Sequence, residues 1–392
     1  MGRTQPAVFS GPFARVTIAN FFFFLNFASF FLLPLYVKAL GGSDAMVGVV
    51  MGTGGTATFL VLPLVGLGID RIGRRRFLIL GAAGMTLASM SYLWVDTIGP
   101  TLLLLRVLQG ASFAAAFTAT TTFAAEFAPR ERRAQALGIF GLSTLLTHAI
   151  APTVGEEVIR RGGFHTLFAL TMCFTVIVVG LAICLPSGVG QRTPGTVAAP
   201  WRVERLEWVV AATMVLSGMG FGTVITFIAT FIHGEGLGRA GIFFAAYTST
   251  AILTRFVGAG LSDSLGRRAV ILPTLVVLAA AILSLAFVHD VPLLVGAGAL
   301  FGSAQGISYP TMHAFLVDMT AEAHLGRAQA LFNGAFNLGV TSSAFIFGAA
   351  AAQFGYRIMF ALAALTPLLA CGVFYRYGTS RPAPRPDAQW AA

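Results

Sequence analysis

The stretch GLGIDRIGRR at residues 66–75 returns in the second half of the chain as GLSDSLGRR at residues 260–268. A second stretch, RAQAL at residues 133–137, returns unchanged at residues 327–331. Both separations are close to half of the 392-residue chain, and each stretch is a short charged turn between long apolar segments. The chain is therefore predicted to consist of two homologous halves.

The composition is that of a chain whose surface faces lipid. Hydrophobic residues make up 56% of the chain and charged residues only 10%, whereas a soluble domain carries about 25% charged residues. Apolar runs of about 20 residues, the length needed to cross a bilayer, recur from Phe13 to Tyr377. The first run is too long for the apolar core of a signal peptide and is interpreted as a spanning helix. The predicted fold class is an all-α membrane protein with twelve transmembrane helices in two pseudo-symmetric bundles of six.

Charged or Gly/Pro-rich turns divide the chain into twelve apolar segments. Their approximate ranges are 13–39, 45–69, 77–95, 101–127, 134–158, 163–186, 207–234, 239–262, 269–288, 292–318, 328–353 and 356–377. These ranges predict an N-terminal bundle (1–186), a polar Gly- and Pro-rich cytoplasmic linker (187–206), a C-terminal bundle (207–377) and a cytoplasmic tail (378–392).

Positive charge is distributed unequally between the two sets of loops. Eighteen of the 25 arginines and lysines lie in one set of loops and tails, five lie in the other, and Arg106 and Arg255 lie within helices. Because cytoplasmic loops carry the excess of positive charge, we expect both termini in the cytoplasm and the chain in a bacterial inner membrane. The net charge of +10 is spread over these loops and not over a soluble domain, so the expected partner is the lipid bilayer and no nucleic acid.

The turn after the second segment resembles the signature of the major facilitator superfamily (MFS) of secondary transporters, and residues 263–268 resemble its weaker copy. The resemblance covers almost the whole chain and implies two bundles around a central cavity that work by alternating access. Gly66 allows a neighbouring helix to approach closely, Gly73 permits a tight turn, and Asp70 can hold an arginine or a helix N-terminus. We expect these residues to latch one bundle against the other; alternatively, the arginines serve only topology.

The expected conformational latch extends to two carboxylates, Glu126 and Asp318, which close equivalent helices shortly before the repeated RAQAL. They are expected to pair with nearby arginines, or they are solvated helix ends. The complete set of expected latch residues is Gly66, Asp70, Arg71, Gly73, Arg74, Glu126, Arg133, Asp263, Gly266, Arg267, Asp318 and Arg327.

LRVLQG at residues 105–110 resembles the R-x-x-Q-G signature of the fourth helix in this family, where the arginine is associated with proton coupling. A charge inside a membrane helix costs at least ~2.5 kcal/mol on insertion scales, so Arg106 with Gln109 is a candidate functional site. The alternative is a structural tether to a neighbouring polar group. Arg255, in the eighth segment, is expected to have a structural use, either reaching toward the cytoplasmic side or pairing with an acid.

The fifth segment resembles, in degraded form, the G-x8-G-x3-G-P-x2-G-G pattern of the family's antiporters. It keeps Gly138, Pro152 and Gly155, which form the expected packing motif of this helix. Thr and Ala at two of the other glycine positions still permit close packing, but Glu156 at the last position departs from the pattern. The resemblance favours the drug/proton antiporter-like efflux branch.

The central cavity is expected to be apolar with sparse polar groups. His148 is expected either to carry a coupling proton, because histidine titrates near neutral pH, or to be a packing residue. The segments contain no run of charges, which favours an uncharged, amphipathic or cationic lipophilic substrate. The candidate substrate and proton-coupling residues are Asn26, Arg106, Gln109, His148, Tyr247, Gln305, Tyr309, His313 and Asn337.

The sequence predicts neither an enzyme nor a cofactor or metal site. Residues 52–57 formally fit a dinucleotide fingerprint but lie within an apolar segment with no preceding strand, so close helix packing is the expected role of their glycines. Lys38 is the only lysine, so no Walker lysine exists, and the three cysteines lack metal-type spacing.

We therefore expect a monomeric, proton-coupled transporter that exports small apolar or amphipathic molecules. The alternative is an importer of a metabolite or a metal-chelate. A membrane enzyme or a receptor would need a polar catalytic constellation or an appended soluble domain, and neither is visible in the sequence.

Overall fold

The computed structural model describes residues 11–129, 132–187, 205–321 and 324–378, without the side chains of Asp70, Ala134 and Ala259. Among these residues, ten helices are long and apolar enough to cross a membrane. Two of the ten, α6 (Arg133–Ile183) and α11 (Leu325–Tyr377), are interrupted by a glycine with positive φ, Gly163 (73°) and Gly355 (79°) respectively. Each is therefore two spanning helices joined by a tight turn, and the twelve predicted spans are confirmed.

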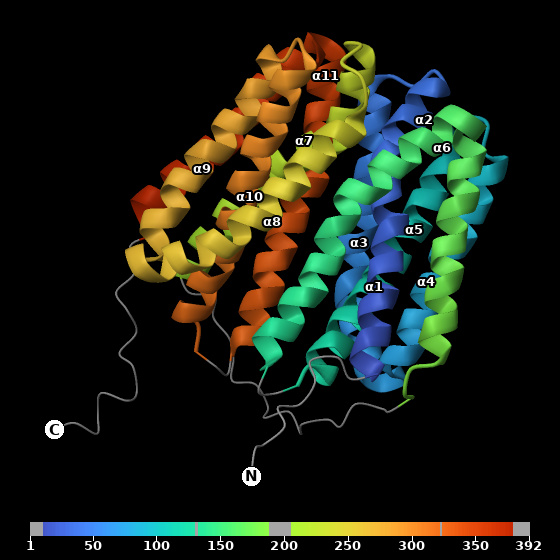
Figure 1. Cartoon of the computed structure of the whole chain (residues 1–392), viewed down its shortest axis with the longest axis horizontal. Helices are drawn as coiled ribbons and strands as arrows, with labels where there is room; N and C mark the ends of the chain where they lie inside the picture. The colour runs from blue at the N-terminus through green and yellow to red at the C-terminus, as the bar shows by residue number, and fades with distance from the viewer. Residues whose placement is uncertain (1–10, 130–131, 188–204, 322–323, 379–392) are drawn as a thin grey trace.

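The N-terminal half is built from the first six spans (Figure 1). Its elements are α1 (Gly11–Ser29), the 3-10 turn η1 (Phe30–Leu32) and α2 (Leu33–Ala39), which form one span, then α3 (Asp44–Ile72), α4 (Arg74–Ser91) with η2 (Tyr92–Trp94), α5 (Pro100–Phe127) and the two parts of α6. The elements of the C-terminal half are α7 (Arg205–Gly234), α8 (Ala240–Leu265), α9 (Arg267–Ser284) with η4 (Leu285–Phe287), α10 (Val291–Met319) and the two parts of α11. The predicted linker and tail lie almost entirely outside the described residues.

Local sequence explains where several helices start and stop. At the start of α3, the Ser43 hydroxyl accepts a hydrogen bond from the Met46 amide at 3.2 Å. At the start of α10, the Asp290 carboxylate accepts one from the Leu293 amide at 2.8 Å. Both helices therefore begin with a side-chain cap. Gly73 (φ 98°) separates α3 from α4 in the same conformation in which Gly266 (φ 88°) separates α8 from α9. The two predicted signature turns thus have equivalent backbones.

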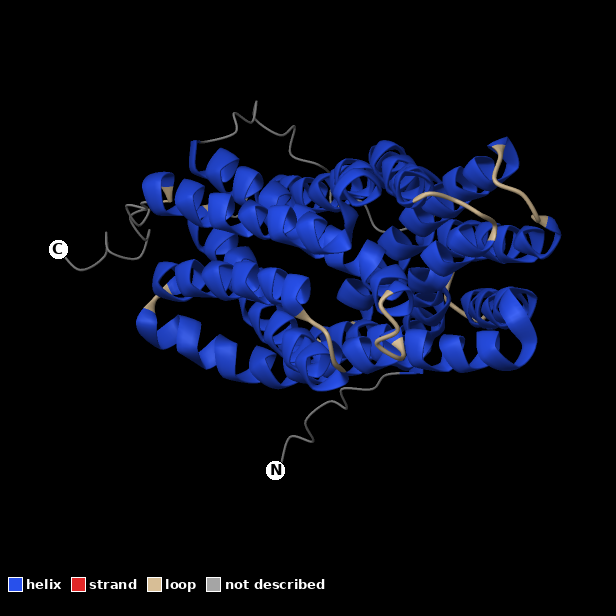
Figure 2. Ribbon diagram, turned by 90° about the horizontal axis from the view of Figure 1, so that it is seen from above, coloured by secondary structure: helices blue, strands red, loops and turns tan. Residues whose placement is uncertain are grey.

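The spans alternate in direction, so the turns fall into two sets. We call the end with the Gly73 and Gly266 turns the arginine-rich end, and the end with the Gly163 and Gly355 turns the opposite end. The opposite end lies at the top of Figure 1, where α2, α6, α7 and α11 approach one another. Seen from above in Figure 2, the helices form two groups, and no strand occurs among the described residues.

The two halves share a hydrophobic core near the opposite end only. One cluster of buried residues includes both Phe31 from η1 and Phe244 from α8, whose rings stack with centroids 5.6 Å apart. A second cluster, around Phe123, contains N-terminal residues, and a third, around Phe315, contains C-terminal residues. The packed interior is therefore continuous across the halves at one end and divided toward the other.

Close backbone approach also joins the halves. Gly48 of α3 lies against Gly348 of α11, so that a Cβ added at Gly348 would lie 2.9 Å from the Gly48 Cα atom. Gly52, one turn further along α3, lies against the ring of Phe345. The glycines of this stretch therefore occupy helix–helix contacts, as the sequence predicts.

Candidate functional site

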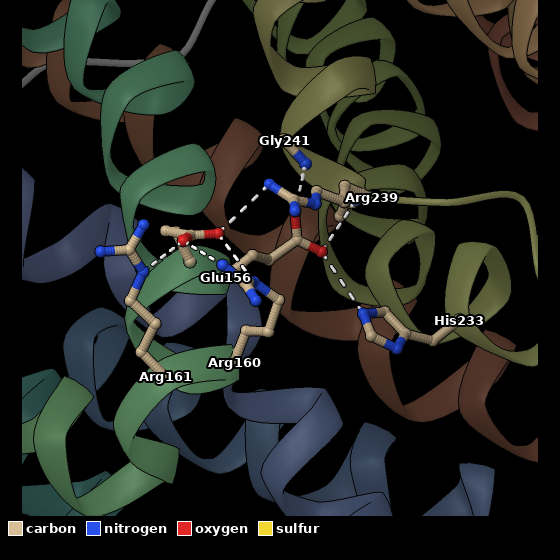
Figure 3. Close-up of polar contacts among 8 residues, drawn as sticks. Glu156, Arg160, Arg161, His233, Arg239 and Gly241 are labelled. Atoms are coloured by element: carbon tan, nitrogen blue, oxygen red, sulfur yellow. Dashed lines mark hydrogen bonds and ion pairs between the residues drawn. The ribbon is translucent and has the colours of Figure 1, made fainter.

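Glu156 joins the two halves at the opposite end. It lies in α6 and is only 7% exposed. Its Oε1 accepts a hydrogen bond from the Ala240 amide and its Oε2 accepts one from the Gly241 amide, both at 2.8 Å (Figure 3). These amides belong to the first turn of α8, where unpaired N–H groups and the helix dipole favour a carboxylate. The Nε2 atom of His233, at the end of α7, lies 3.4 Å from Oε1.

Further charged contacts surround Glu156. Glu157 accepts hydrogen bonds from Arg160 and Arg161 on its own helix, and its Oε2 lies 3.4 Å from Nη1 of Arg239 in the other half (Figure 3). Asp44 at the start of α3 accepts a hydrogen bond from the Tyr356 hydroxyl of α11. These contacts and Glu156 form what we call the closure, a set of polar contacts between the halves at the opposite end.

From the sequence, Glu156 is only a departure from the glycine pattern of the fifth segment, and the closure is not predicted. The available signal was the residue itself, because an acidic side chain within an apolar segment requires a partner. The partner is a pair of backbone amides in the other half, and no residue pattern marks such donors.

His148 lies between the halves, below the closure. Its ring packs edge-on against Phe31, with centroids 5.2 Å apart, and is roughly parallel to the ring of Tyr247 in α8 at 6.2 Å. Among the described residues, the His148 Nδ1 atom has no hydrogen-bond partner. The candidates His148 and Tyr247 are thus brought together, one from each half.

Arg106 lies in the interior of the N-terminal half. It is 9% exposed, and it donates hydrogen bonds to the Val50 carbonyl of α3 at 3.1 Å and to Oε1 of Gln109 at 2.7 Å. The Tyr92 hydroxyl donates to the same Gln109 oxygen at 2.9 Å. This geometry is that of a tether between α3, α4 and α5, which was the alternative weighed for Arg106. A role in proton coupling remains a prediction.

Asn26 also bonds within its own half. Its Nδ2 donates to the Ser89 hydroxyl at 3.0 Å and to the Thr171 carbonyl at 2.9 Å, which ties the first span to the third and the sixth. It is fully buried and does not join the other candidate residues.

The remaining candidates gather on α10 and α11. The Tyr309 hydroxyl donates to Oδ1 of Asn333 at 2.9 Å, and the Asn337 amide donates to the Asn333 carbonyl at 2.9 Å. His313, one turn from Tyr309, packs edge-on against Phe332 with ring centroids 5.2 Å apart.

Gln305 lies one turn before Tyr309 in α10. It is 9% exposed, and its Nε2 has no hydrogen-bond partner among the described residues. Its amide is therefore a buried hydrogen-bond donor without an acceptor in this conformation.

Three ion pairs between described residues at the arginine-rich end each join residues of one half. Arg74 of α4 lies 3.2 Å from the Glu126 carboxylate of α5. Arg267 of α9 lies 2.5 Å from Asp263 and 3.0 Å from Asp318 of α10. The expected pairing of Glu126 and Asp318 with arginines is therefore observed.

The other expected latch residues occupy the same end. Arg71, Arg133 and Gly66 are exposed, Arg327 is partly buried, and the side chain of Asp70 lies outside the described residues. A latch that joins the two halves at this end remains a prediction, because in this conformation the halves pack together at the other end.

The expected packing motif of the fifth span is tight at one position and open at another. A Cβ added at Gly155 would lie 2.8 Å from the Leu32 side chain, whereas one added at Gly138 would meet nothing within 4 Å. Pro152, which lies between these two glycines in the sequence, is buried. Close packing thus accounts for Gly155 but not for Gly138. Among the described residues, no group of His, Cys, Asp or Glu could hold a metal ion.

Two homologous six-helix halves that are packed together at one end and carry charged turns at the other define the class of α-helical secondary transporters. The chain belongs to the Major Facilitator Superfamily, whose family model matches residues 16–244 and 210–392. It is therefore a multi-pass membrane transporter that acts on small molecules.

Relatives cover nearly the whole chain. The multi-drug resistance efflux pump PmrA of Streptococcus pneumoniae is 26% identical over 379 residues, covering 91% of this chain and 94% of that protein. The staphylopine export protein of Staphylococcus aureus is 22% identical over 399 residues, covering 96% and 97%. The crystal structure of the nucleoside transporter NupG has a TM-score of 0.78 at 14% identity, covering 95% of this chain and 100% of that chain, which shows the shared fold alone.

Proposed function

We propose that this transporter exports small apolar or amphipathic molecules in exchange for protons, by alternating access in a bacterial inner membrane. The excess of positive charge assigns the arginine-rich end to the cytoplasm. With that orientation, the closure around Glu156 seals the periplasmic side, and substrate is loaded from the cytoplasm. The proposed unit is a monomer, because one chain contains both halves that must move.

The observation that carries proton coupling is the position of His148 between Phe31 and Tyr247, with Nδ1 unpaired. An imidazolium held there would lack a compensating hydrogen bond in an apolar interface, which costs free energy. When the halves part at the closure, the ring meets the periplasm and takes up a proton. When they close again, the proton leaves, so each return to this conformation moves a proton inward.

Arg106 has a second, indirect part in the proposal. Arg106 bonds to Val50 of the second span and to Gln109 of its own, fourth span, and Gln109 in turn accepts a hydrogen bond from Tyr92 at the end of the third span. These bonds fix the second, third and fourth spans relative to one another. The N-terminal half can then move as one body while His148 separates from Tyr247. Arg106 is thus proposed as a positioning residue for the coupling step.

Export is favoured over import by the relatives, two of which are named for efflux or export, and by the retained part of the antiporter-like pattern in the fifth span. The alternative is import of a metabolite or a metal-chelate by the same fold. Whole-cell accumulation in a deletion strain separates the two: loss of an exporter raises the cellular content of the substrate, and loss of an importer lowers it.

Everted membrane vesicles test the coupling directly. Respiration acidifies their interior, and a panel of small amphipathic compounds is added while compound uptake and proton release are recorded. We expect uptake to stop when the pH gradient is collapsed, and His148→Gln to lose gradient-driven accumulation while still exchanging labelled for unlabelled compound. The matched control is His165→Gln, because His165 is exposed and lies beyond the closure. Accumulation that is unchanged both when the pH gradient is collapsed and in His148→Gln contradicts proton coupling.

A further inference from the structure

Arg255 is a charged residue within a spanning helix that has no acidic partner among the residues that the structure describes. The nearest acid on its own helix, Asp263, is paired with Arg267. Asp263 is about 12 Å further along α8 at 1.5 Å per residue, so Arg255 lies well inside the span. The acidic partner expected from the sequence as one alternative is not found among the described residues, and a reach toward the cytoplasmic side remains a prediction.

The face of α8 that carries Arg255 is turned toward the N-terminal half. Gly241 and Phe244 mark that face, because they contact Thr153 and Phe31 of the other half. At 3.6 residues per turn, Arg255 follows Phe244 by about three turns and therefore lies on the same face.

The opposite face of α8 is the lipid face. Leu253, Phe256 and Val257 are 66%, 68% and 67% exposed, as expected for apolar side chains that contact lipid. Arg255 is also exposed, but it lies between the halves, beyond the point where their shared core ends.

Two tyrosines, and no acid among the described residues, lie near Arg255. Its guanidinium lies within electrostatic range of the phenols of Tyr247 and Tyr309. Tyr309 donates to Oδ1 of Asn333, which leaves the exposed Asn333 amide N–H groups available. One turn before Tyr309, Gln305 is buried, so its unpartnered Nε2 does not reach this site in the present conformation.

The two arginines inside spans are therefore used differently. Arg106 donates to a carbonyl and a glutamine, whereas the five N–H donors of Arg255 have no hydrogen-bond partner among the described residues. An uncompensated charge inside a membrane span is costly and marks a substrate pathway.

We propose that Arg255, with the amide of Asn333, binds the anionic group of an amphipathic organic acid between the two halves. A carboxylate fits the guanidinium fork with two parallel hydrogen bonds. The ring of Phe336, which packs against Tyr309 and is only partly buried, lies beside this group and accepts the apolar body of the acid. The inference rests on the proposed function, and it replaces cationic lipophilic molecules by anionic ones as the substrate class.

The test compares three molecules that share an indole ring and differ in charge: indole-3-acetate, tryptophol and tryptamine. Each is added to the purified protein in detergent, and the thermal midpoint is recorded over a concentration series, because a bound ligand raises apparent stability. We expect indole-3-acetate to raise the midpoint more than tryptophol, and tryptamine to have no effect. Arg255→Gln should weaken the response to indole-3-acetate at least about tenfold, and Arg255→Lys should weaken it less.

Controls separate a site from general effects. Arg376→Gln removes an exposed arginine near the end of α11 and should leave the response unchanged. Unliganded midpoints of all variants verify folding. A parallel series with phosphatidylglycerol distinguishes a lipid headgroup: a response to this lipid that depends on Arg255, without one to indole-3-acetate, overturns the proposal.

The other outcomes are also decisive. Equal responses to all three indoles, no response of the wild-type protein to indole-3-acetate, or a response that survives Arg255→Gln each overturn the anion site. These binding results are independent of the proton gradient. Failure of the anion site therefore leaves the vesicle result for export standing, and failure of proton-coupled export leaves the binding result standing.

Discussion

The two ends of the molecule use their charges in opposite ways. At the opposite end, Glu156 binds the amides of Ala240 and Gly241 across the halves. At the arginine-rich end, Arg74 pairs with Glu126, and Arg267 pairs with acids of its own half. Among the described residues, Glu156 therefore holds the halves together at one end, whereas these arginine pairs stiffen each half separately at the other. This difference describes a transporter closed on one side.

Glu156→Ala should have the largest effect. It removes two charge-assisted hydrogen bonds and leaves two amides of α8 unpaired, which should shift the equilibrium away from the closed state by about 3 kcal/mol, more than a hundredfold. Labelling of a cysteine placed at Ala240, which is fully buried at the closure, should accelerate accordingly in a cysteine-free background. Glu156→Gln keeps one acceptor and should lie between the wild type and the alanine variant. Unchanged labelling in Glu156→Ala would contradict the closure.

Gly48→Val should act at the same end by steric means. The added side chain would meet the backbone of Ala344 and Gly348 in α11, and overpacking of this kind costs typically about 1–3 kcal/mol. The same labelling assay should show opening without any change in charge. The matched control is Gly66→Val, because a Cβ at Gly66 meets nothing within 4 Å. Equal labelling of the two variants would show that α3 and α11 do not hold the halves together.

Arg267→Gln should affect the other end weakly. It breaks the pairs with Asp263 and Asp318, whose side chains are 66% and 55% exposed, so the expected loss of stability is at most about 1 kcal/mol. The thermal midpoint should fall slightly, and the loss should shrink in high salt. Labelling of the cysteine at Ala240 should stay at the wild-type rate; accelerated labelling would mean that these pairs also control the closure.

Gly138→Ala should have the smallest effect. The position has space for a methyl group and lies within a helix, where alanine is favoured over glycine by about 1 kcal/mol. The thermal midpoint should stay the same or rise. A large fall would show that close packing at Gly138 occurs in a conformation other than this one.

The fold could be predicted from sequence because it depends on length, hydropathy and repetition. The apolar segments set the twelve spans, and the repeated turns at Gly73 and Gly266 mark the two halves. The equivalence of Glu126 and Asp318 was visible in the repeat, and their arginine partners lie within reach of the same turn.

The candidate site was less predictable because it depends on contacts between segments far apart in the chain. Asn26 and Arg106 are polar residues in spans, but their partners lie within one half. Glu156 could be judged only after α8 was placed beside it, since its partners are backbone amides. The position of Arg255 between the halves could be recognised only once the orientation of α8 was known. The order of residues in α8 does not say which face of the helix is turned toward the other half.

The most direct test of the central claim measures distances at both ends at once. Spin labels at Gln135 and Gln329, equivalent exposed positions of the repeated RAQAL, report the arginine-rich end, and labels at Thr166 and Gln353 report the opposite end. Double electron–electron resonance would compare the wild type with Glu156→Ala after replacement of Cys173, Cys184 and Cys371. We expect the distance between Gln135 and Gln329 to shorten and the distance between Thr166 and Gln353 to lengthen in Glu156→Ala. Two unchanged distances, or two that change in the same direction, would contradict it.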